Sequence, residues 1–169
     1  DWQYLVHHMF DSPGRFFFNE QIDMPVDLET YKKRVEFTEP EQLPYICFAI
    51  ENNAGQHAGI ANLFGVDERN GIFGPIGIVI NPADRGRGYA LAEYRMLGRY
   101  MFHERRMHKW NSGYFEENKA SEALHKKAGF TVEGIQRGMA FHEGRYWNMV
   151  LCGMTAQEFF ENEAALQNL

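Results

Sequence analysis

Residues 78–90 read IVINPADRGRGYA, an apolar run that passes through a glycine-rich turn into a longer periodic pattern. The run is typical of a β-strand, and the spacing after Tyr89 is typical of an amphipathic helix. A helix N-terminus carries unpaired N–H donors and partial positive charge, and glycines there let the backbone approach an anion closely. Arg85 and Arg87 add fixed positive charge suited to phosphate oxygens. The segment therefore predicts a pyrophosphate-binding turn.

Two better-known phosphate-binding motifs do not fit this turn. A Walker loop requires Gly-Lys-Ser/Thr, which the turn does not contain. A Rossmann fingerprint requires Gly-x-Gly-x-x-Gly after the first strand of a parallel unit, whereas the glycine spacing here is different. A surface turn with two solvated arginines remains as the alternative interpretation, because short glycine-rich motifs are weak evidence on their own.

Upstream of the turn, the pattern predicts three strands in series, at 45–50, 57–66 and 72–80. Turn signals at 51–56 and at Asn70-Gly71 separate them, so an antiparallel meander is expected. Gly74, Pro75 and Gly77 are poor strand residues, and they predict a bulge or a close backbone approach within the third strand.

Downstream of the turn, helices and strands alternate. An apolar stripe predicts a helix over 89–103, and a strand is expected at 109–115. Asn118 is a good N-cap for a helix through Ala128 that is followed by Gly129. The residues of that helix expected to face inward are Ala120, Leu124 and Ala128.

The C-terminal part predicts two strands, at 130–137 and 145–152, joined around 142–144. Thr155 to Glu158 forms a capping box for a last helix. Near the N-terminus, apolar residues at helical spacing between Trp2 and Phe10 predict one helix, and Asp27 can cap another. The order ααβββαβαββα predicts an α+β, or mixed α/β, fold in a single domain over residues 1–169.

Composition narrows the functional classes. The chain has 169 residues and a net charge of −6, and its 44% hydrophobic content excludes an intrinsically disordered polymer. An acidic chain is a poor candidate for nucleic-acid binding, including RNA binding through the Arg-Gly-Arg-Gly segment. No membrane span or signal peptide is recognisable, so a cytoplasmic location is expected. Cys47 and Cys152 are both expected to be buried, and the seven histidines predict no metal site.

The segment Arg85–Ala90 fits the Gln/Arg-x-x-Gly-x-Gly/Ala signature of the GNAT superfamily of acyl-CoA N-acyltransferases. An apolar strand with Asn-Pro precedes it at 78–82, and an Asn-led helix ending in Gly-Phe follows at 118–130. The chain resembles this superfamily over about residues 45–152. Within it, the chain is most similar to the branch of spermidine acetyltransferases and ribosomal-protein N-terminal acetyltransferases, and the 142–148 hairpin is similar to that of the polyamine enzymes.

The resemblance implies a central, mostly antiparallel twisted sheet that splays into a V and is flanked by helices. Acetyl-CoA, as co-substrate, would lie in the V, with its pantetheine arm on the backbone of the 72–80 strand and its pyrophosphate at the helix start. A backbone N–H of that strand would polarise the thioester carbonyl, and the amine would attack without a covalent enzyme intermediate. The implied cofactor-binding residues are Ile78, Val79, Ile80, Arg85, Gly86, Arg87, Gly88, Tyr89, Ala90 and Asn118.

Two side chains are candidates for protonating the coenzyme A thiolate. His125 occupies the position at which many family members carry a tyrosine, and an imidazole with a pKa of ~6.5 can donate a proton. Ser121 is the second candidate, because the ribosomal-protein branch carries serine there. The alternative interpretations are a solvated histidine and a serine that completes the helix cap. No carboxylate lies at 73–76, so the general base is left open among Asp67, Glu68, Glu116, Glu143 and a water chain.

The implied reaction is transfer of an acetyl group to a primary amine, which could be a polyamine, a protein N-terminus or another small-molecule amine. The missing strand carboxylate and the histidine at the acid position leave an alternative, a non-catalytic acyl-CoA sensor or assembly module of the same fold. Family members often dimerise, and an aromatic content of 15% is compatible with a homodimer. No nucleic-acid or membrane partner is expected.

Overall fold

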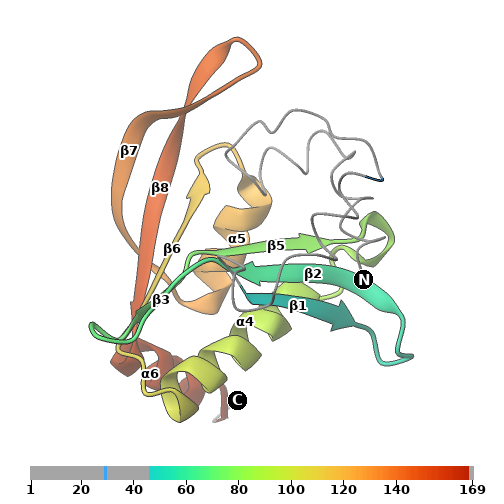
Figure 1. Ribbon diagram of the computed structural model, residues 1–169, viewed down its shortest axis with the longest axis vertical. Coiled ribbons are helices and arrows are strands. Elements are labelled where there is room, and N and C mark those ends of the chain that lie inside the picture. Colours follow the sequence, from blue (N-terminus) through green and yellow to red (C-terminus); the bar gives the residue numbers. More distant parts are fainter. Residues whose placement is uncertain (1–28, 30–45, 168–169) are drawn as a thin grey trace.

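The computed structural model describes Glu29 and residues 46–167, and Figure 1 shows their arrangement. The two helices predicted before residue 45 lie outside the described residues, apart from Glu29, which is helical. The remaining elements form two sheets and three α-helices, a mixed α+β fold as the sequence predicted.

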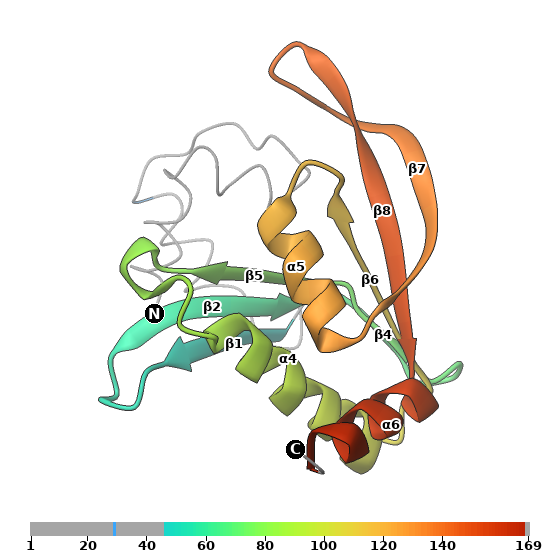
Figure 2. The same ribbon diagram turned by 180° about the vertical axis from the view of Figure 1, so that it is seen from behind.

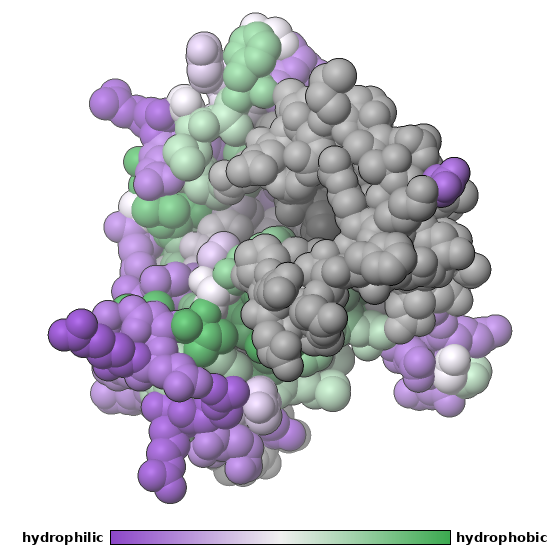
Figure 3. Space-filling model, viewed as in Figure 1, coloured by the Kyte–Doolittle hydropathy of each residue, from purple (hydrophilic) through white to green (hydrophobic). Residues whose placement is uncertain are grey.

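The first sheet contains the predicted antiparallel meander. Its strands are β1 (Ile46–Glu51), β2 (His57–Leu63) and β5 (Ile76–Ile80), in the order β1-β2-β5. Gly59 lies opposite Ile80 and Leu63 lies opposite Ile76, so β5 is paired with β2 over its whole length. In Figure 3, the strongly hydrophilic residues gather over the β1–β2 turn, at the right, and the β3–β4 turn, at the lower left.

The prediction of one continuous strand at 72–80 is wrong, because the chain breaks at Gly74-Pro75. The first part, β4 (Ile72–Phe73), pairs in parallel with β6 (Lys109–Phe115), and only the second part joins β2. Gly74 has φ 101°, and a Cβ at this position would collide with the carbonyl oxygen of Asn111. The predicted close backbone approach is confirmed here, and it also transfers the chain from one sheet to the other. The 57–66 run is divided in the same way, into β2 and β3 (Val66–Asp67).

The second sheet has the order β3-β4-β6-β8-β7. Its outer hairpin, β7 (Thr131–His142) and β8 (Arg145–Thr155), is longer than predicted and projects beyond the rest of the sheet in Figure 1. Gly138, with φ 62°, lies in an irregular stretch of pairing between Gln136 and Ala140, so β7 continues past the glycine instead of ending there. Glu143 and Gly144 both have positive φ and close the hairpin.

Three helices cover one side of this framework, as Figure 2 shows from behind. They are α4 (Tyr89–Arg99), α5 (Lys119–Ala128) and α6 (Ala156–Gln167). The predicted 89–103 helix ends as a π-helical turn, Tyr100–Glu104. The predicted caps are confirmed, since Asn118 accepts a hydrogen bond from the Ser121 N–H, and Thr155 and Glu158 exchange the bonds of a capping box.

The main core lies between the helices and the strands, and its largest fully buried side chains are Trp110, Phe73, Leu63, Met101 and Met154. Two expectations about burial are wrong. Cys47 is exposed, because alternation along β1 puts Phe48 and Ile50 on the core side and Cys47 on the other face, whereas Cys152 is buried. Ala120 is exposed, and the residue of α5 that is buried instead is His125.

Candidate functional site

The glycine-rich turn leads into α4 with its backbone donors available. Gly88 is the N-cap of α4 with φ 89°, Gly86 has φ 75°, and no described side chain caps the helix. A Cβ placed on either glycine would meet nothing within 4 Å, so open space lies over the turn. The left-handed backbone explains why glycine is needed, and the first N–H groups of α4 make the turn an anion-binding feature.

The two arginines of the turn are exposed at the surface but are held by neighbouring groups. Arg85 Nε donates to the carbonyl oxygen of Ile80 at 3.1 Å, and Arg87 Nη1 lies 3.5 Å from Asp84 Oδ1. Each arginine of this turn is therefore in contact with another group of the protein, although both are exposed. The contact with Asp84 also means that an anion at the turn would compete with a carboxylate for Arg87.

The free edge of β5 lies directly upstream of the turn. Asn81 donates its N–H to the Ala58 carbonyl, and Phe64 donates to the Pro75 carbonyl. Backbone groups of successive residues alternate between the two edges of a strand, so Val79 faces β2, whereas Ile78 and Ile80 face the opposite edge. No described strand pairs with that edge. It offers both backbone groups of Ile78 and the N–H of Ile80, since Arg85 already occupies the Ile80 carbonyl.

The facing edge belongs to β6. Glu116 donates its N–H to the Asn148 carbonyl, so the same alternation turns Ser112 and Tyr114 toward β8, and Asn111 and Gly113 toward β5. Pairing between β4 and β6 ends at Phe73 and Trp110, after which β5 and β6 diverge. We call the region between β5 and residues 111–115 the fork. It is the splayed arrangement that the family resemblance implied, with Gly74 at its closed end.

His125 lies inside the protein behind the fork. Its side chain is 3% exposed, so the alternative of a solvated helical histidine is wrong. His125 Nε2 lies 2.8 Å from Ser112 Oγ, and Nδ1 lies 2.8 Å from the Ser121 carbonyl oxygen and 3.3 Å from Ser121 Oγ. Burial lowers the pKa of His125 below its ordinary value, and the hydrogen bond with the Ser121 backbone opposes that shift only in part. His125 is consequently a neutral imidazole at neutral pH.

Aromatic rings surround this imidazole. The ring centroids of Tyr94, Tyr114 and Phe130 lie 5.7, 5.0 and 5.1 Å from that of His125. Tyr94 is itself buried, and burial raises the pKa of its phenol above its ordinary value. The sequence analysis did not connect Ser112 with His125, because β6 and α5 meet only in the folded chain.

The remaining predicted residues are placed as follows. The Asn118 side-chain oxygen is engaged by the Ser121 N–H. Among the carboxylates considered as bases, Asp67 bonds to Asn70 in the β3–β4 turn and Glu68 pairs with Arg105. Glu143 lies at the tip of the β7–β8 hairpin, and Glu116, directly after β6, accepts a hydrogen bond from Asn148 at 2.8 Å. Glu116 is the one of these four that adjoins the open end of the fork.

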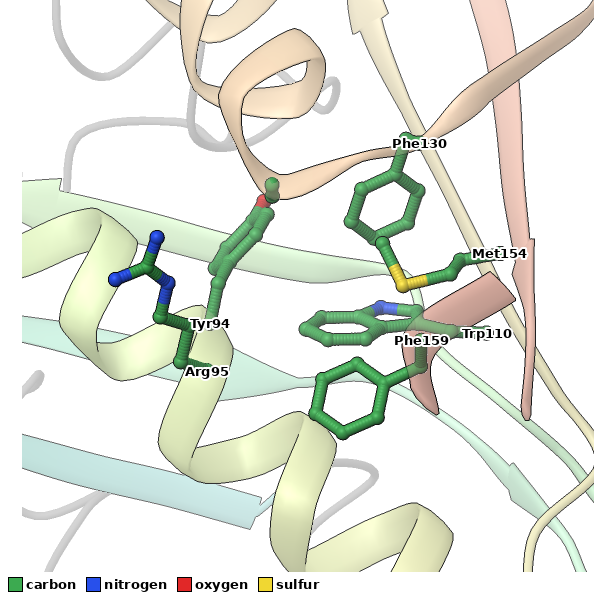
Figure 4. Close-up of a pocket in the computed structure, with 7 residues that line it drawn as sticks. Tyr94, Arg95, Trp110, Phe130, Met154 and Phe159 are labelled. Carbon is green, nitrogen blue, oxygen red and sulfur yellow. The ribbon is translucent and has the colours of Figure 1, made fainter. Parts of the chain in front are cut away.

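A small cavity lies below this site, between α4, α5, β6 and α6 (Figure 4). In this view Tyr94 rises from α4 toward α5, and Arg95 points away from the aromatic side chains. The cavity is lined almost entirely by apolar groups, and the buried Trp110 Nε1 has no hydrogen-bond partner. Its lining residues are Tyr94, Arg95, Trp110, Ala128, Phe130, Met154 and Phe159. Such a cavity does not suit a charged cofactor.

Over Glu29 and 46–167, no three His, Cys, Asp or Glu side chains are grouped so that they could hold a metal ion. None of the helices described there is long and apolar enough to cross a membrane.

Comparison with known proteins places this geometry in a family. The acetyltransferase (GNAT) domain matches residues 5–131. The SPbeta prophage-derived uncharacterized N-acetyltransferase YokL of Bacillus subtilis (strain 168) is 34% identical over 124 residues, covering 73% of this chain and 68% of YokL. The spermidine N-acetyltransferase from Vibrio cholerae, in complex with CoA and spermine, superposes with a TM-score of 0.82 at 17% identity, over 95% of this chain and 92% of that one. A dodecameric structure of the Vibrio cholerae enzyme in an intermediate state gives a TM-score of 0.63 at 21% identity, over 78% of this chain and 73% of that one.

Proposed function

Because the chain belongs to the GNAT acetyltransferase family, and is therefore an acetyl-CoA-dependent N-acetyltransferase, we propose that the fork between β5 and β6 holds acetyl-CoA and presents its thioester to a primary amine. The observation that supports this most directly is the alignment of two features. The edge of β5 that no described strand pairs with runs straight into a helix N-terminus that no described side chain caps, and the glycines there have left-handed backbones. An extended amide-bearing arm and an anionic head match these two features in that order.

In the proposed complex, the pantetheine arm bonds to the open-edge backbone of Ile78 and Ile80, and the pyrophosphate lies on the N–H groups from Gly86 to Ala90. Arg85 and Arg87 contribute positive charge beside it. Val79 lies between the two contact residues, with its backbone turned to β2, so we assign it no direct hydrogen bond to the cofactor.

The chemistry then follows from what an amine and a thioester require. The neutral amine attacks the thioester carbonyl carbon, and an N–H of the fork edge stabilises the developing oxyanion. The C–S bond of the tetrahedral intermediate breaks with its electron pair moving to sulfur. The ammonium proton leaves nitrogen, and the coenzyme A thiolate is protonated. We place the Ser121–His125 pair at this last step, and Glu116, beside the open end of the fork, is the carboxylate we propose as the proton acceptor for the incoming ammonium.

The proposed acceptor is a small cationic amine of the polyamine class. Glu116 and Glu117 follow β6 and are exposed, and the net charge of the chain is −6, so a cation is favoured electrostatically. The solved structure with the TM-score of 0.82 holds spermine. A protein N-terminus and other small-molecule amines are the competing acceptors.

The experiment is a panel of polyamines, N-terminal peptides and aminoglycosides, each assayed for release of free coenzyme A thiol and for the acetylated product. The expected result is transfer to at least one polyamine with kcat/KM at least tenfold above that for peptides. Glu116→Gln should reduce transfer to cationic amines more than Glu143→Gln, its counterpart at the hairpin tip. Tight binding of coenzyme A with no transfer to any amine would instead favour the sensor alternative.

We also propose that the chain self-associates through the exposed apolar residues of the β7–β8 hairpin. They include Val132, Ile135, Met139, Phe141 and Tyr146, of which Tyr146 is 72% exposed. An apolar strip of this kind is typical of an interaction surface. Light scattering on the wild type and on Ile135→Asp/Phe141→Asp would test this, with a lower mass expected for the variant.

A further inference from the structure

A chain of hydrogen bonds connects β6 and α5 behind the fork. It runs from the Ser112 hydroxyl to His125 Nε2, and from His125 Nδ1 to Ser121. The ring of Tyr94, on α4, packs edge-on against the imidazole, with 5.7 Å between the ring centroids. Tyr94, Ser112 and His125 are 2%, 6% and 3% exposed, whereas Ser121, in the first turn of α5, is only half-buried. This hydrogen-bond chain therefore begins in the core and ends near the surface.

The direction of these hydrogen bonds is fixed by one group that can only accept. The carbonyl oxygen of Ser121 lies 2.8 Å from His125 Nδ1, so Nδ1 carries the proton and donates it. In a neutral imidazole Nε2 is then an acceptor, and the Ser112 hydroxyl, 2.8 Å away, must donate to it.

This direction decides what Ser121 can do. His125 Nδ1 lies 3.3 Å from Ser121 Oγ and has a proton to offer, so Ser121 Oγ is an acceptor on that side. The hydroxyl proton of Ser121 must then point elsewhere. Burial favours the protonated phenol of Tyr94 and the neutral form of His125, because it shifts both pKa values away from the charged form. The hydrogen-bond chain consequently keeps the same order of donors and acceptors around neutral pH.

We propose that Ser112 is a positioning residue that holds His125 as its Nδ1-protonated tautomer, and that His125 in turn orients the Ser121 hydroxyl as a hydrogen-bond donor toward the coenzyme A sulfur. This inference rests on the proposed function for its last link. As the C–S bond breaks, the Ser121 proton moves to sulfur, and Ser121 regains a proton from the ammonium nitrogen of the tetrahedral intermediate. Neither an external acid nor a charged histidine is needed, and the new amide nitrogen ends neutral.

The first test measures the tautomer without any substrate. In nitrogen–proton correlation spectra of the unliganded protein, His125 should show a protonated Nδ1 and an unprotonated Nε2 at pH 7.5. Ser112→Ala should shift the Nε2 resonance, whereas Cys152→Ala, a buried change across from Ser112 on β8, should not. A protonated Nε2 in the wild type would overturn the inference, whether or not the protein transfers acetyl groups.

The second test separates positioning from simple packing. We expect Ser112→Ala to lower kcat about tenfold and to leave the KM for acetyl-CoA within about twofold, because the hydrogen-bond chain acts in the chemical step. Ser112→Thr, which keeps a hydroxyl, should restore most of kcat, and this variant also controls for folding. Ser121→Ala should lower kcat at least as far, and adding Ser112→Ala to it should lower kcat no further. Multiplicative losses in the double variant, or no rescue by threonine, would contradict the proposal.

Discussion

The glycine-rich turn at 85–88 and the Ser112–His125–Ser121 hydrogen-bond chain lie at two ends of the proposed reaction, and they are built in opposite ways. The turn is exposed, its donors are backbone N–H groups, and its form depends on two left-handed glycines that lie two residues apart in sequence. In the hydrogen-bond chain Ser112 and His125 are buried, the donors are side chains, and the members come from two elements, β6 and α5. The helix α4 connects the two regions, since it begins at the turn and its Tyr94 ring packs against the imidazole of His125. The proposed binding of the cofactor therefore depends on residues that are close in sequence, whereas the proposed proton transfer depends on tertiary packing.

This difference predicts that a change in the turn alters affinity and leaves the fold intact. Gly88→Glu should weaken acetyl-CoA binding at least a hundredfold, because a carboxylate would face the pyrophosphate and the left-handed backbone would be strained. Isothermal titration measures the effect. Gly55→Glu is the matched control, since Gly55 has φ 71°, lies in open space and is remote from the turn. Equal affinity in the Gly88 variant and the control would remove the turn from the site.

The second prediction concerns a buried carboxyl on α4, next to Tyr94. Burial raises the pKa of Glu93 from 4.5 to about 7, and its Oε2 has no hydrogen-bond partner among the residues that the structure describes. A carboxyl whose folded pKa is raised stabilises the fold fully below pH ~4.5, and that contribution is lost as the pH rises through about 7. Glu93→Gln should therefore be more stable than the wild type at pH 8, by about 2 kcal/mol, with little gain at pH 5.

Urea denaturation at the two pH values measures this gain in the free energy of unfolding. Glu117→Gln, an exposed carboxylate change, is the control and should alter stability by only a few tenths of a kcal/mol at either pH. A gain of the same size at pH 5 and pH 8 would show that charge on Glu93 is not the cause.

The sequence predicts features that depend on neighbouring residues better than features that depend on tertiary contacts. The turn, its glycines and the caps at Asn118 and Thr155 depend on neighbouring residues, and their patterns predicted them correctly. At Gly74 the sequence predicted a bulge or a close backbone approach but not a transfer between sheets, because the carbonyl of Asn111 that forbids a side chain there is 37 residues away in sequence. His125 has a surface-like sequence context, beside Lys126 and Lys127, and only the contact with β6 shows that it is buried.

The third prediction removes the centre of the hydrogen-bond chain. His125→Phe should lower kcat about tenfold and leave acetyl-CoA affinity within about twofold, because the turn that binds the cofactor is unchanged. It should also reduce the free energy of unfolding by about 1–3 kcal/mol, since the buried Ser112 hydroxyl loses its acceptor. Lys127→Ala, an exposed change on the same helix, is the control. A loss of affinity comparable to the loss of kcat would show that the two regions are not separable.

The smallest effect is expected at the arginine that Asp84 already holds. Arg87→Ala removes one positive charge from the turn, but the exposed pair with Asp84 is worth less than about 1 kcal/mol. Coenzyme A affinity should fall about threefold at low salt and by less at high salt, because exposed charges are screened. Asp84→Asn frees Arg87 from its partner and should raise the affinity about twofold. Arg95→Ala, an exposed arginine further along α4, should change nothing in the same titration. If Asp84→Asn weakened binding, the carboxylate would be holding Arg87 in place for the phosphate instead of competing with it, and the turn, like the hydrogen-bond chain, would depend on side-chain positioning.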